Sequence, residues 1–94
     1  MTNTTLTIRR AARSDFPAVA RLAALDSSFP PTGDVLLAEM DDELWAAVGV
    51  ESGSAVADPF RPSGDLVELL RLRAQGLRGR DERRRVARLL PRAA

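Results

Sequence analysis

The chain contains no cysteine and no histidine among its 94 residues. Without cysteine there is no disulfide framework, zinc ribbon or thiol nucleophile. Without histidine there is no imidazole base, and the Ser-His-Asp and Cys-His classes of active site are excluded. Tyrosine and lysine are also absent, and aromatic residues make up only 4% of the chain. The residue types alone therefore do not name a reaction.

Long apolar runs are missing as well. No stretch approaches the roughly 18 apolar residues that a membrane helix needs, and residues 1–5 have neither the basic start nor the apolar stretch of a secretory signal. We therefore expect no transmembrane segment and a cytoplasmic location. The 45% of hydrophobic and 29% of charged residues are typical of one small packed domain.

Charge is distributed unevenly along the chain. Residues 1–76 hold seven arginines and eleven acids, a net charge of −4, whereas residues 77–94 hold seven arginines and two acids, a net charge of +5. We therefore predict a domain over 1–76 and a basic C-terminal tail over 77–94.

The tail carries an apolar stripe at helical spacing, formed by Val86, Leu89, Leu90 and Ala93. It either frays in solvent or lies on a surface, such as its own domain, a partner chain or an anionic lipid layer. Because the tail has no aromatic residue for stacking on bases, nucleic acid is not the anionic partner we expect.

The hydrophobic pattern predicts a strand, a helix, three further strands and two helices, in that order. The strands are expected at residues 6–9, 35–40, 44–50 and 55–57, and the helices at about 14–25, 63–75 and 81–90. Pro17 falls in the first turn of the first helix, and Asp41-Asp42 forms a tight hairpin turn. Gly76 and Gly79 are expected to end the second helix. The two central strands are apolar on both faces, which indicates a sheet covered on both sides.

Two segments resemble the GCN5-related N-acetyltransferase (GNAT) superfamily. Residues 8–15 (IRRAARSD) look like the family's entry into its first helix, and residues 35–47 (VLLAEMDDELWAA) look like its central hairpin. Ala12 stands where the family has a capping threonine, so Ser14 or Asp15 is expected to cap the helix instead. The resemblance covers residues 6–75. It implies an α/β (α+β) fold, a truncated GNAT-like β-α-β-β-β-α order with a mainly antiparallel sheet and an Arg-rich C-terminal helical tail.

In that family a loop of the form R/Q-x-x-G-x-G/A holds the pyrophosphate of acetyl-CoA through backbone N–H groups at a helix N-terminus. The matching segment here is 61–66 (RPSGDL), so the resemblance implies cofactor-binding roles for Arg61, Ser63, Gly64 and Asp65. The segment departs from the pattern, because Pro62 lacks an N–H group and Leu66 replaces the last small residue. Ser63 and Asp65 are also good capping residues, so a self-capped helix start is the alternative interpretation.

The sequence assigns no catalytic residue and no metal ligand. Glu39, Glu43 and Glu51 are candidate bases for acetyl transfer, but ordinary solvated acids are the simpler interpretation. The adjacent acids at 41–43 are expected to form a solvated turn, because neighbouring side chains do not converge on one ion. Trp45, the only tryptophan, is expected in the core or at an interface.

We therefore expect a small GNAT-related protein that lacks a complete acetyl-CoA site and is non-catalytic or regulatory. One alternative is a small acetyl-CoA-dependent N-acetyltransferase whose cleft is completed by a second copy of the chain. Another is an interaction module that binds an anionic partner through its Arg-rich tail. A shortened sheet leaves an exposed edge or apolar face, so a homodimer is expected.

Overall fold

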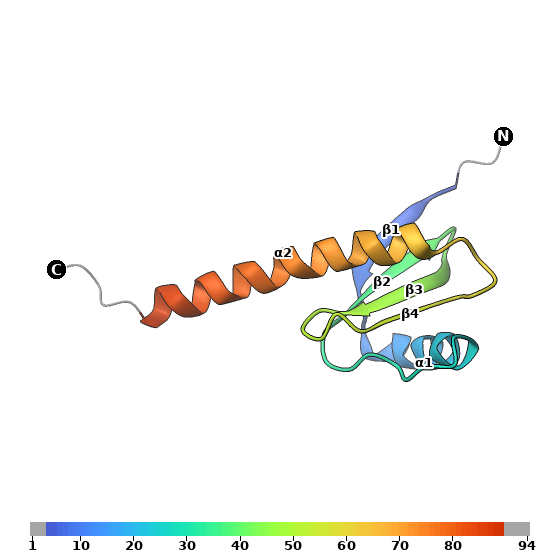
Figure 1. Ribbon diagram of the computed structural model, residues 1–94, viewed down its shortest axis with the longest axis horizontal. Coiled ribbons are helices and arrows are strands. Elements are labelled where there is room, and N and C mark those ends of the chain that lie inside the picture. Colours follow the sequence, from blue (N-terminus) through green and yellow to red (C-terminus); the bar gives the residue numbers. More distant parts are fainter. Residues whose placement is uncertain (1–3, 90–94) are drawn as a thin grey trace.

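The structure is a computed structural model that describes residues 4–89, and it has mixed α and β character (Figure 1). Its elements follow the predicted order, except that one helix stands where two were predicted after the last strand. They are β1 (Leu6–Arg10), a short 3-10 turn η1 (Arg13–Asp15), α1 (Phe16–Leu25), β2 (Val35–Met40), β3 (Glu43–Gly49), β4 (Ala55–Ala57) and α2 (Gly64–Leu89). Among residues 4–89, no helix is both long and apolar enough to cross a membrane.

The four strands form one antiparallel sheet in the order β1-β2-β3-β4, so strands that follow one another in sequence lie side by side. The predicted hairpin turn between β2 and β3 is confirmed. Asp41 and Asp42 have φ angles of 51° and 69°, as in the type I′ turns whose twist matches that of paired strands. Aspartate is among the residues that tolerate this left-handed backbone.

A β-bulge interrupts the pairing of β2 with β3. Ala38 lies opposite Ala46, whereas Glu39 lies opposite Leu44, so Trp45 is the extra residue on β3. Bulges bend a strand and redirect its side chains. This bulge sets the position of Trp45 at the site described below.

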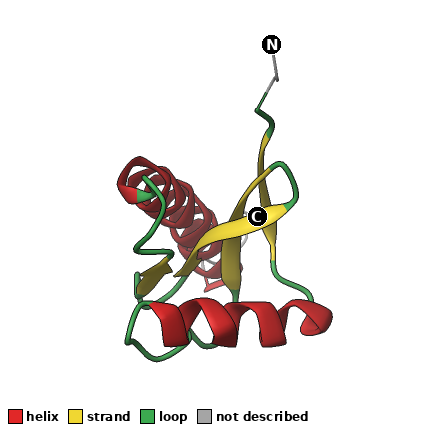
Figure 2. Cartoon of the chain, turned by 90° about the vertical axis from the view of Figure 1, so that its right-hand side faces the viewer, coloured by secondary structure: helices red, strands yellow, loops and turns green. Residues whose placement is uncertain are grey.

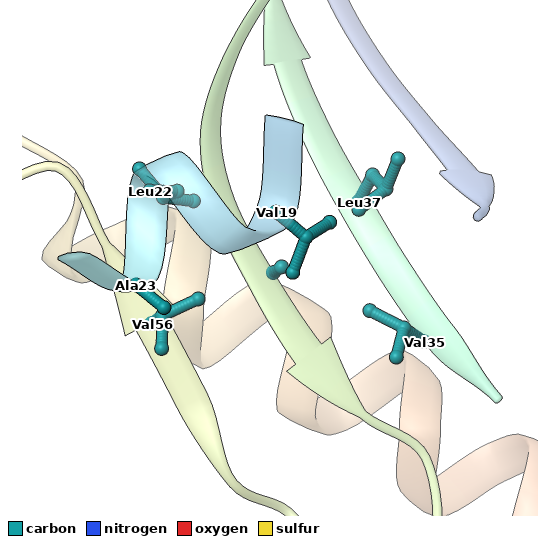
Figure 3. Packing of buried hydrophobic residues seen from close by; sticks show 7 residues of the cluster. Val19, Leu22, Ala23, Val35, Leu37 and Val56 are labelled. Carbon is teal, nitrogen blue, oxygen red and sulfur yellow. The ribbon is translucent and has the colours of Figure 1, made fainter. Parts of the chain in front are cut away.

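The sheet is covered on both faces, as predicted. On one face α1 contributes Val19, Leu22 and Ala23, which pack against residues of β2, β3 and β4 (Figure 3). On the other face α2 contributes Leu70 and Ala74. The central strands are apolar on both sides because each side packs against a helix. Their alanines, Ala38, Ala46 and Ala47, have no exposed surface.

The predicted end of the second helix at Gly76 is wrong. Helix α2 runs without a break from Gly64 to Leu89 and so includes residues 81–89 of the third helix expected at 81–90, while Leu90 lies outside the described residues. A glycine costs a helix interior only about 1 kcal/mol, and this cost is offset where the body holds the helix. Leu77 packs on the core, and Arg78 Nη1 donates to the Val50 carbonyl at 2.5 Å.

Beyond Arg78, α2 extends clear of the sheet and gives the molecule its long dimension of 59 Å (Figure 1). Val86, from the predicted apolar stripe, is 54% exposed on this projecting part. The side chain of Leu89 and residues 90–94, which include Leu90 and Ala93, lie outside the described part of the structure.

Candidate functional site

The four residues that the resemblance assigned to acetyl-CoA lie in the loop between β4 and α2 (Arg61 and Ser63) and at the start of α2 (Gly64 and Asp65). Arg61 lies across the start of β3 rather than at the helix N-terminus. Its Nη2 donates to Glu43 Oε2 at 2.8 Å, its Nε lies 3.8 Å from Asp58 Oδ2, and its guanidinium lies 5.1 Å from the centroid of the Trp45 ring. An ion pair and a cation–π contact therefore connect this loop to the sheet.

Ser63 immediately precedes α2 and is buried, with 6% of its surface exposed. Its hydroxyl donates to the Asp58 carbonyl at 3.1 Å and to the Arg61 carbonyl at 3.3 Å. Its own carbonyl accepts from the Val67 N–H at 3.1 Å, the first hydrogen bond of the helix. The hydroxyl thus closes the loop onto itself.

Gly64 and Asp65 form the exposed start of α2. A Cβ atom added at Gly64 would meet no atom within 4 Å, so no close contact requires glycine at this position. The carboxylate of Asp65 lies in the first turn, where it interacts favourably with the helix dipole. An anion approaching the N–H groups of this turn would meet the same carboxylate.

The indole Nε1 of Trp45 is buried and has no hydrogen-bond partner among residues 4–89. A buried donor without a partner costs about 1–3 kcal/mol. The Arg61 guanidinium lies over the ring and is itself a donor, so it provides no acceptor for this N–H group.

A cleft of about 450 Å³ lies between α1 and the sheet, and we refer to it as the acidic cleft. It contains more carboxylates than guanidinium groups. Its charged residues are Asp15, Glu39, Asp42, Glu43, Asp58, Arg9 and Arg21. The cleft brings together acids from η1, from both central strands and the turn between them, and from the β4–α2 loop, segments that are far apart in sequence.

Arg9 organises one wall of the acidic cleft. Its Nη1 and Nη2 donate to the two oxygens of Asp15 at 2.8 Å each, and its Nε donates to Glu39 Oε1 at 2.6 Å. Asp15 Oδ2 also accepts from the Ala12 N–H at 2.6 Å. These bonds lower the pKa of Asp15 from 3.8 to about 2, chiefly through the hydrogen bonds from Arg9, and they raise the pKa of Arg9.

The start of α1 differs in detail from the expected cap. Asp15 occupies the N-cap position of α1, but its side chain makes no capping bond to that helix. It instead bonds backward to Ala12 and Arg9. The predicted Pro17 in the first turn is confirmed. Sequence reasoning missed the ion pair, although Arg9 and Asp15 both lie in the 8–15 segment that carried the resemblance.

Two of the three candidate bases line the acidic cleft. Glu39 is bonded there to Arg9, and Glu43 is bonded to Arg61. Glu51 is exposed in the turn after β3. Within residues 4–89, no three acidic side chains are placed to hold a metal ion together.

Comparison of the chain with known protein families, with curated proteins and with solved structures finds no match.

Proposed function

We propose that this chain is a GNAT-related protein that is non-catalytic or regulatory rather than an acetyltransferase. The placement of Arg61 is the observation that carries the proposal. Its guanidinium is bonded to Glu43 and lies over Trp45, so contacts within the protein occupy the group that would bind a pyrophosphate. A pyrophosphate would have to displace these contacts, which together contribute about 1 kcal/mol or less because the side chain is partly exposed.

Two further features of the loop support the same proposal. The hydroxyl of Ser63 is bonded to the carbonyls of Asp58 and Arg61. Asp65 adds a negative charge at the helix N-terminus, which opposes the approach of a phosphate group. Acetyl-CoA is therefore a cofactor only under the enzyme alternative.

The test is a thermal melt with and without submillimolar acetyl-CoA, together with an assay for CoA thiol released from acetyl-CoA. Ligand present at about a hundred times its dissociation constant would stabilise the fold by about 2.7 kcal/mol. We expect no shift and no thiol release. A saturable shift that disappears in Arg61→Ala would overturn the proposal and establish the loop as a working cofactor site.

A second candidate function is an interaction module that uses the basic part of α2. The exposed guanidinium groups of Arg83, Arg84, Arg85 and Arg88 on the projecting helix favour it. Positive charges at this density attract an anionic partner and increase its association rate.

A homodimer through the uncovered edge of β1 also stays a prediction, and size-exclusion chromatography with light scattering at micromolar concentration measures it.

A further inference from the structure

A groove of about 330 Å³ runs between β1 and α2 on the face of the sheet that α2 covers, and we refer to it as the basic groove. Ile8 of β1 and Leu36 of β2 line it from the sheet side. Leu72, Gly76 and Leu77 line it from α2. Its surface between the charged groups is therefore apolar.

The groove exists because one helix is too narrow to cover four strands. Strands spaced about 4.8 Å apart make a sheet roughly 19 Å wide, whereas a helix is about 10 Å across. Helix α2 packs mainly over β3, with β2 and β4 beside it. Figure 2 shows β1, the strand that leads from the N-terminus, at the edge of the sheet away from α2. The part of the sheet next to β1 therefore remains uncovered by α2, and Leu72 at its border is 64% exposed.

Three guanidinium groups surround the groove, those of Arg10, Arg73 and Arg80, and no acidic residue lines it. Within residues 4–89 none of these three arginines makes an ion pair or a side-chain hydrogen bond. Arg9 also lines the groove, but its guanidinium is bonded to Asp15 and Glu39 at the acidic cleft. The groove thus combines an apolar floor with free positive charge.

We propose that the basic groove binds an acidic amphipathic helix of a partner protein. The apolar side of that helix would lie on Ile8 and Leu72, and its flanking carboxylates would bond to Arg73 and Arg80. Apolar grooves of one helix width take amphipathic helices in this way, and opposite charges around the contact select the partner and its register. The proposal does not rest on whether acetyl-CoA binds.

Neither helix within residues 4–89 is of this kind, which argues against a second copy as the occupant. Residues 16–25 of α1 contain no acid, and the apolar side of α1 is used in its own core. Pairing of two α2 helices would bring arginines against arginines. Nucleic acid fits less well, because no aromatic side chain lines the groove for base stacking.

The probes are fluorescein-labelled helical peptides of about 18 residues, five turns of helix. One panel has leucines at helical spacing with flanking glutamates, a second has lysines in place of the glutamates, and a third has the glutamate composition in scrambled order. Binding is measured by fluorescence anisotropy with the full chain at about 0.15 M salt, where the Debye length is near 8 Å. We expect saturable binding of the glutamate panel alone.

Gly76 and Gly79 provide a matched pair of variants for locating the contact. A Cβ added at either position meets no atom within 4 Å, so both positions have room for the first atom of a side chain, and circular dichroism melts check that Gly76→Trp and Gly79→Trp are folded. Only Gly76 lines the basic groove. We expect Gly76→Trp to weaken binding by at least about tenfold, equivalent to 1.4 kcal/mol, and Gly79→Trp to bind like the wild type.

A second matched pair tests the charges. Arg73→Glu/Arg80→Glu changes the groove, whereas Arg84→Glu/Arg85→Glu makes the same change in net charge on the projecting helix. We expect only Arg73→Glu/Arg80→Glu to lose binding of the glutamate peptide. The same variant should gain binding of the lysine peptide. Circular dichroism melts confirm that each variant is folded.

Several results would overturn the proposal. One is the absence of saturable binding by every glutamate peptide, and another is binding that Gly76→Trp leaves unchanged. Equal losses of glutamate-peptide binding in Arg73→Glu/Arg80→Glu and Arg84→Glu/Arg85→Glu would mean that the peptide is held by net charge and not by the basic groove. A dimer in solution that Gly76→Trp converts to monomer would make the groove a self-interface. Tighter binding of anionic vesicles than of peptide, abolished by Gly76→Trp, would make it a membrane site.

Discussion

Arg9 connects three elements through one side chain. It bonds to Asp15 at the start of α1 and to Glu39 on β2, while its backbone belongs to β1. A bidentate pair between arginine and a carboxylate has a defined geometry, so it sets the angle at which α1 leaves the sheet. The same pair explains why the Asp15 carboxylate stays charged well below the usual pKa of an aspartate.

The shifted pKa of Asp15 predicts a pH dependence of stability. Because its pKa falls from 3.8 in the unfolded chain to about 2 in the folded one, the charged form stabilises the fold above about pH 4. That contribution is lost as the pH falls from about 4 to about 2. Urea unfolding across this range should show a steeper loss of stability in the wild type than in Asp15→Asn.

Asp42→Asn is the control for this experiment. Asp42 is exposed at the hairpin turn, and asparagine also tolerates its positive φ of 69°. Its pH profile should follow that of the wild type. If Asp15→Asn and the wild type lose stability in parallel between about pH 4 and pH 2, Arg9 does not hold the Asp15 carboxylate as described.

Arg61 predicts a spectroscopic effect because it lies over the only tryptophan. Replacing Arg61 with methionine removes the cation–π contact and the bond to Glu43, while keeping an apolar stem. Since the side chain is 43% exposed, the loss of stability should be about 1 kcal/mol or less. The emission of Trp45 should change in intensity or wavelength.

Arg21→Met is the matched control for Arg61→Met, since Arg21 is an exposed arginine on α1 that has no ion pair within residues 4–89. It should leave the Trp45 emission unchanged. An identical spectrum for Arg61→Met and the wild type would contradict the contact between Arg61 and Trp45. It would also remove the main support for the proposal that Arg61 is bonded within the protein and not available to a pyrophosphate.

At the scale of elements, α2 shows how packing overcomes weak local preference. Its first half is held by Leu70 and Ala74 in the core, and Arg71 Nε donates to the Gly53 carbonyl at 3.3 Å. Leu77 and Arg78 hold the helix again beyond Gly76. The helix therefore continues past two glycines, because contacts on both sides of Gly76 keep it on the sheet.

Gly76→Ala should stabilise the protein by about 0.5–1 kcal/mol, because alanine loses less backbone entropy in a helix. The added Cβ meets no neighbour within 4 Å, so no packing cost opposes this gain. Gly53→Ala is the contrasting variant. Gly53 has a φ of 71°, where a side chain is strained, so alanine should destabilise the protein. Urea unfolding measures both, and a destabilising Gly76→Ala would mean that α2 bends or breaks at this point.

At the scale of the whole molecule, the two helices separate two kinds of charged surface. The acidic cleft lies on the α1 face and the basic groove lies on the α2 face. This difference between faces is not the charge difference along the sequence, because Arg10 and Arg73 of the basic groove belong to residues 1–76. Opposite faces of one small molecule are thus available to partners of opposite charge.

Two truncations separate the part of α2 that supports the fold from the part that projects. Deleting residues 83–94 should leave the melting temperature nearly unchanged, because residues 83–88 are exposed and make no ion pair within the described chain. Deleting residues 77–94 removes Leu77 and the Arg78 bond to Val50, and should cost about 1–3 kcal/mol.

Melts followed by circular dichroism compare the two truncations directly. Equal stability of the two shortened chains would contradict the anchoring role of Leu77 and Arg78. A large loss from deleting 83–94 alone would instead show that the projecting helix contacts the body in solution.

Much of the fold could be predicted because its signals are local. The turn at Asp41-Asp42, the strands beside it and Pro17 in the first turn of α1 depend on residues only a few positions apart. Alternation of apolar residues and backbone preference act over that range. The helix break at Gly76 was predicted by the same local reasoning and was wrong, because contacts from Val50, far away in sequence, outweighed the local cost.

The candidate site could be predicted only in part. The segment 61–65 was singled out from its sequence, but the direction of Arg61 depends on the bulge that places Trp45 and on Glu43 at the end of the hairpin. No spacing in the sequence indicates that Arg61 contacts β3. Arg9 and Asp15 lie close together in the 8–15 segment, so their ion pair could have been predicted, but Glu39, which also bonds to Arg9, comes from another strand.

The sequence by itself determined the order of the elements, the antiparallel hairpin, the two-sided core and the uneven charge, since each follows from periodicity, turn chemistry or composition. Only the tertiary structure decided the continuity of α2, the acidic cleft and the basic groove. The physical reason is that these features depend on the register of the strands and on how much of the sheet one helix can cover. Register and coverage are set by side chains that meet across the fold, and a linear pattern does not contain those distances.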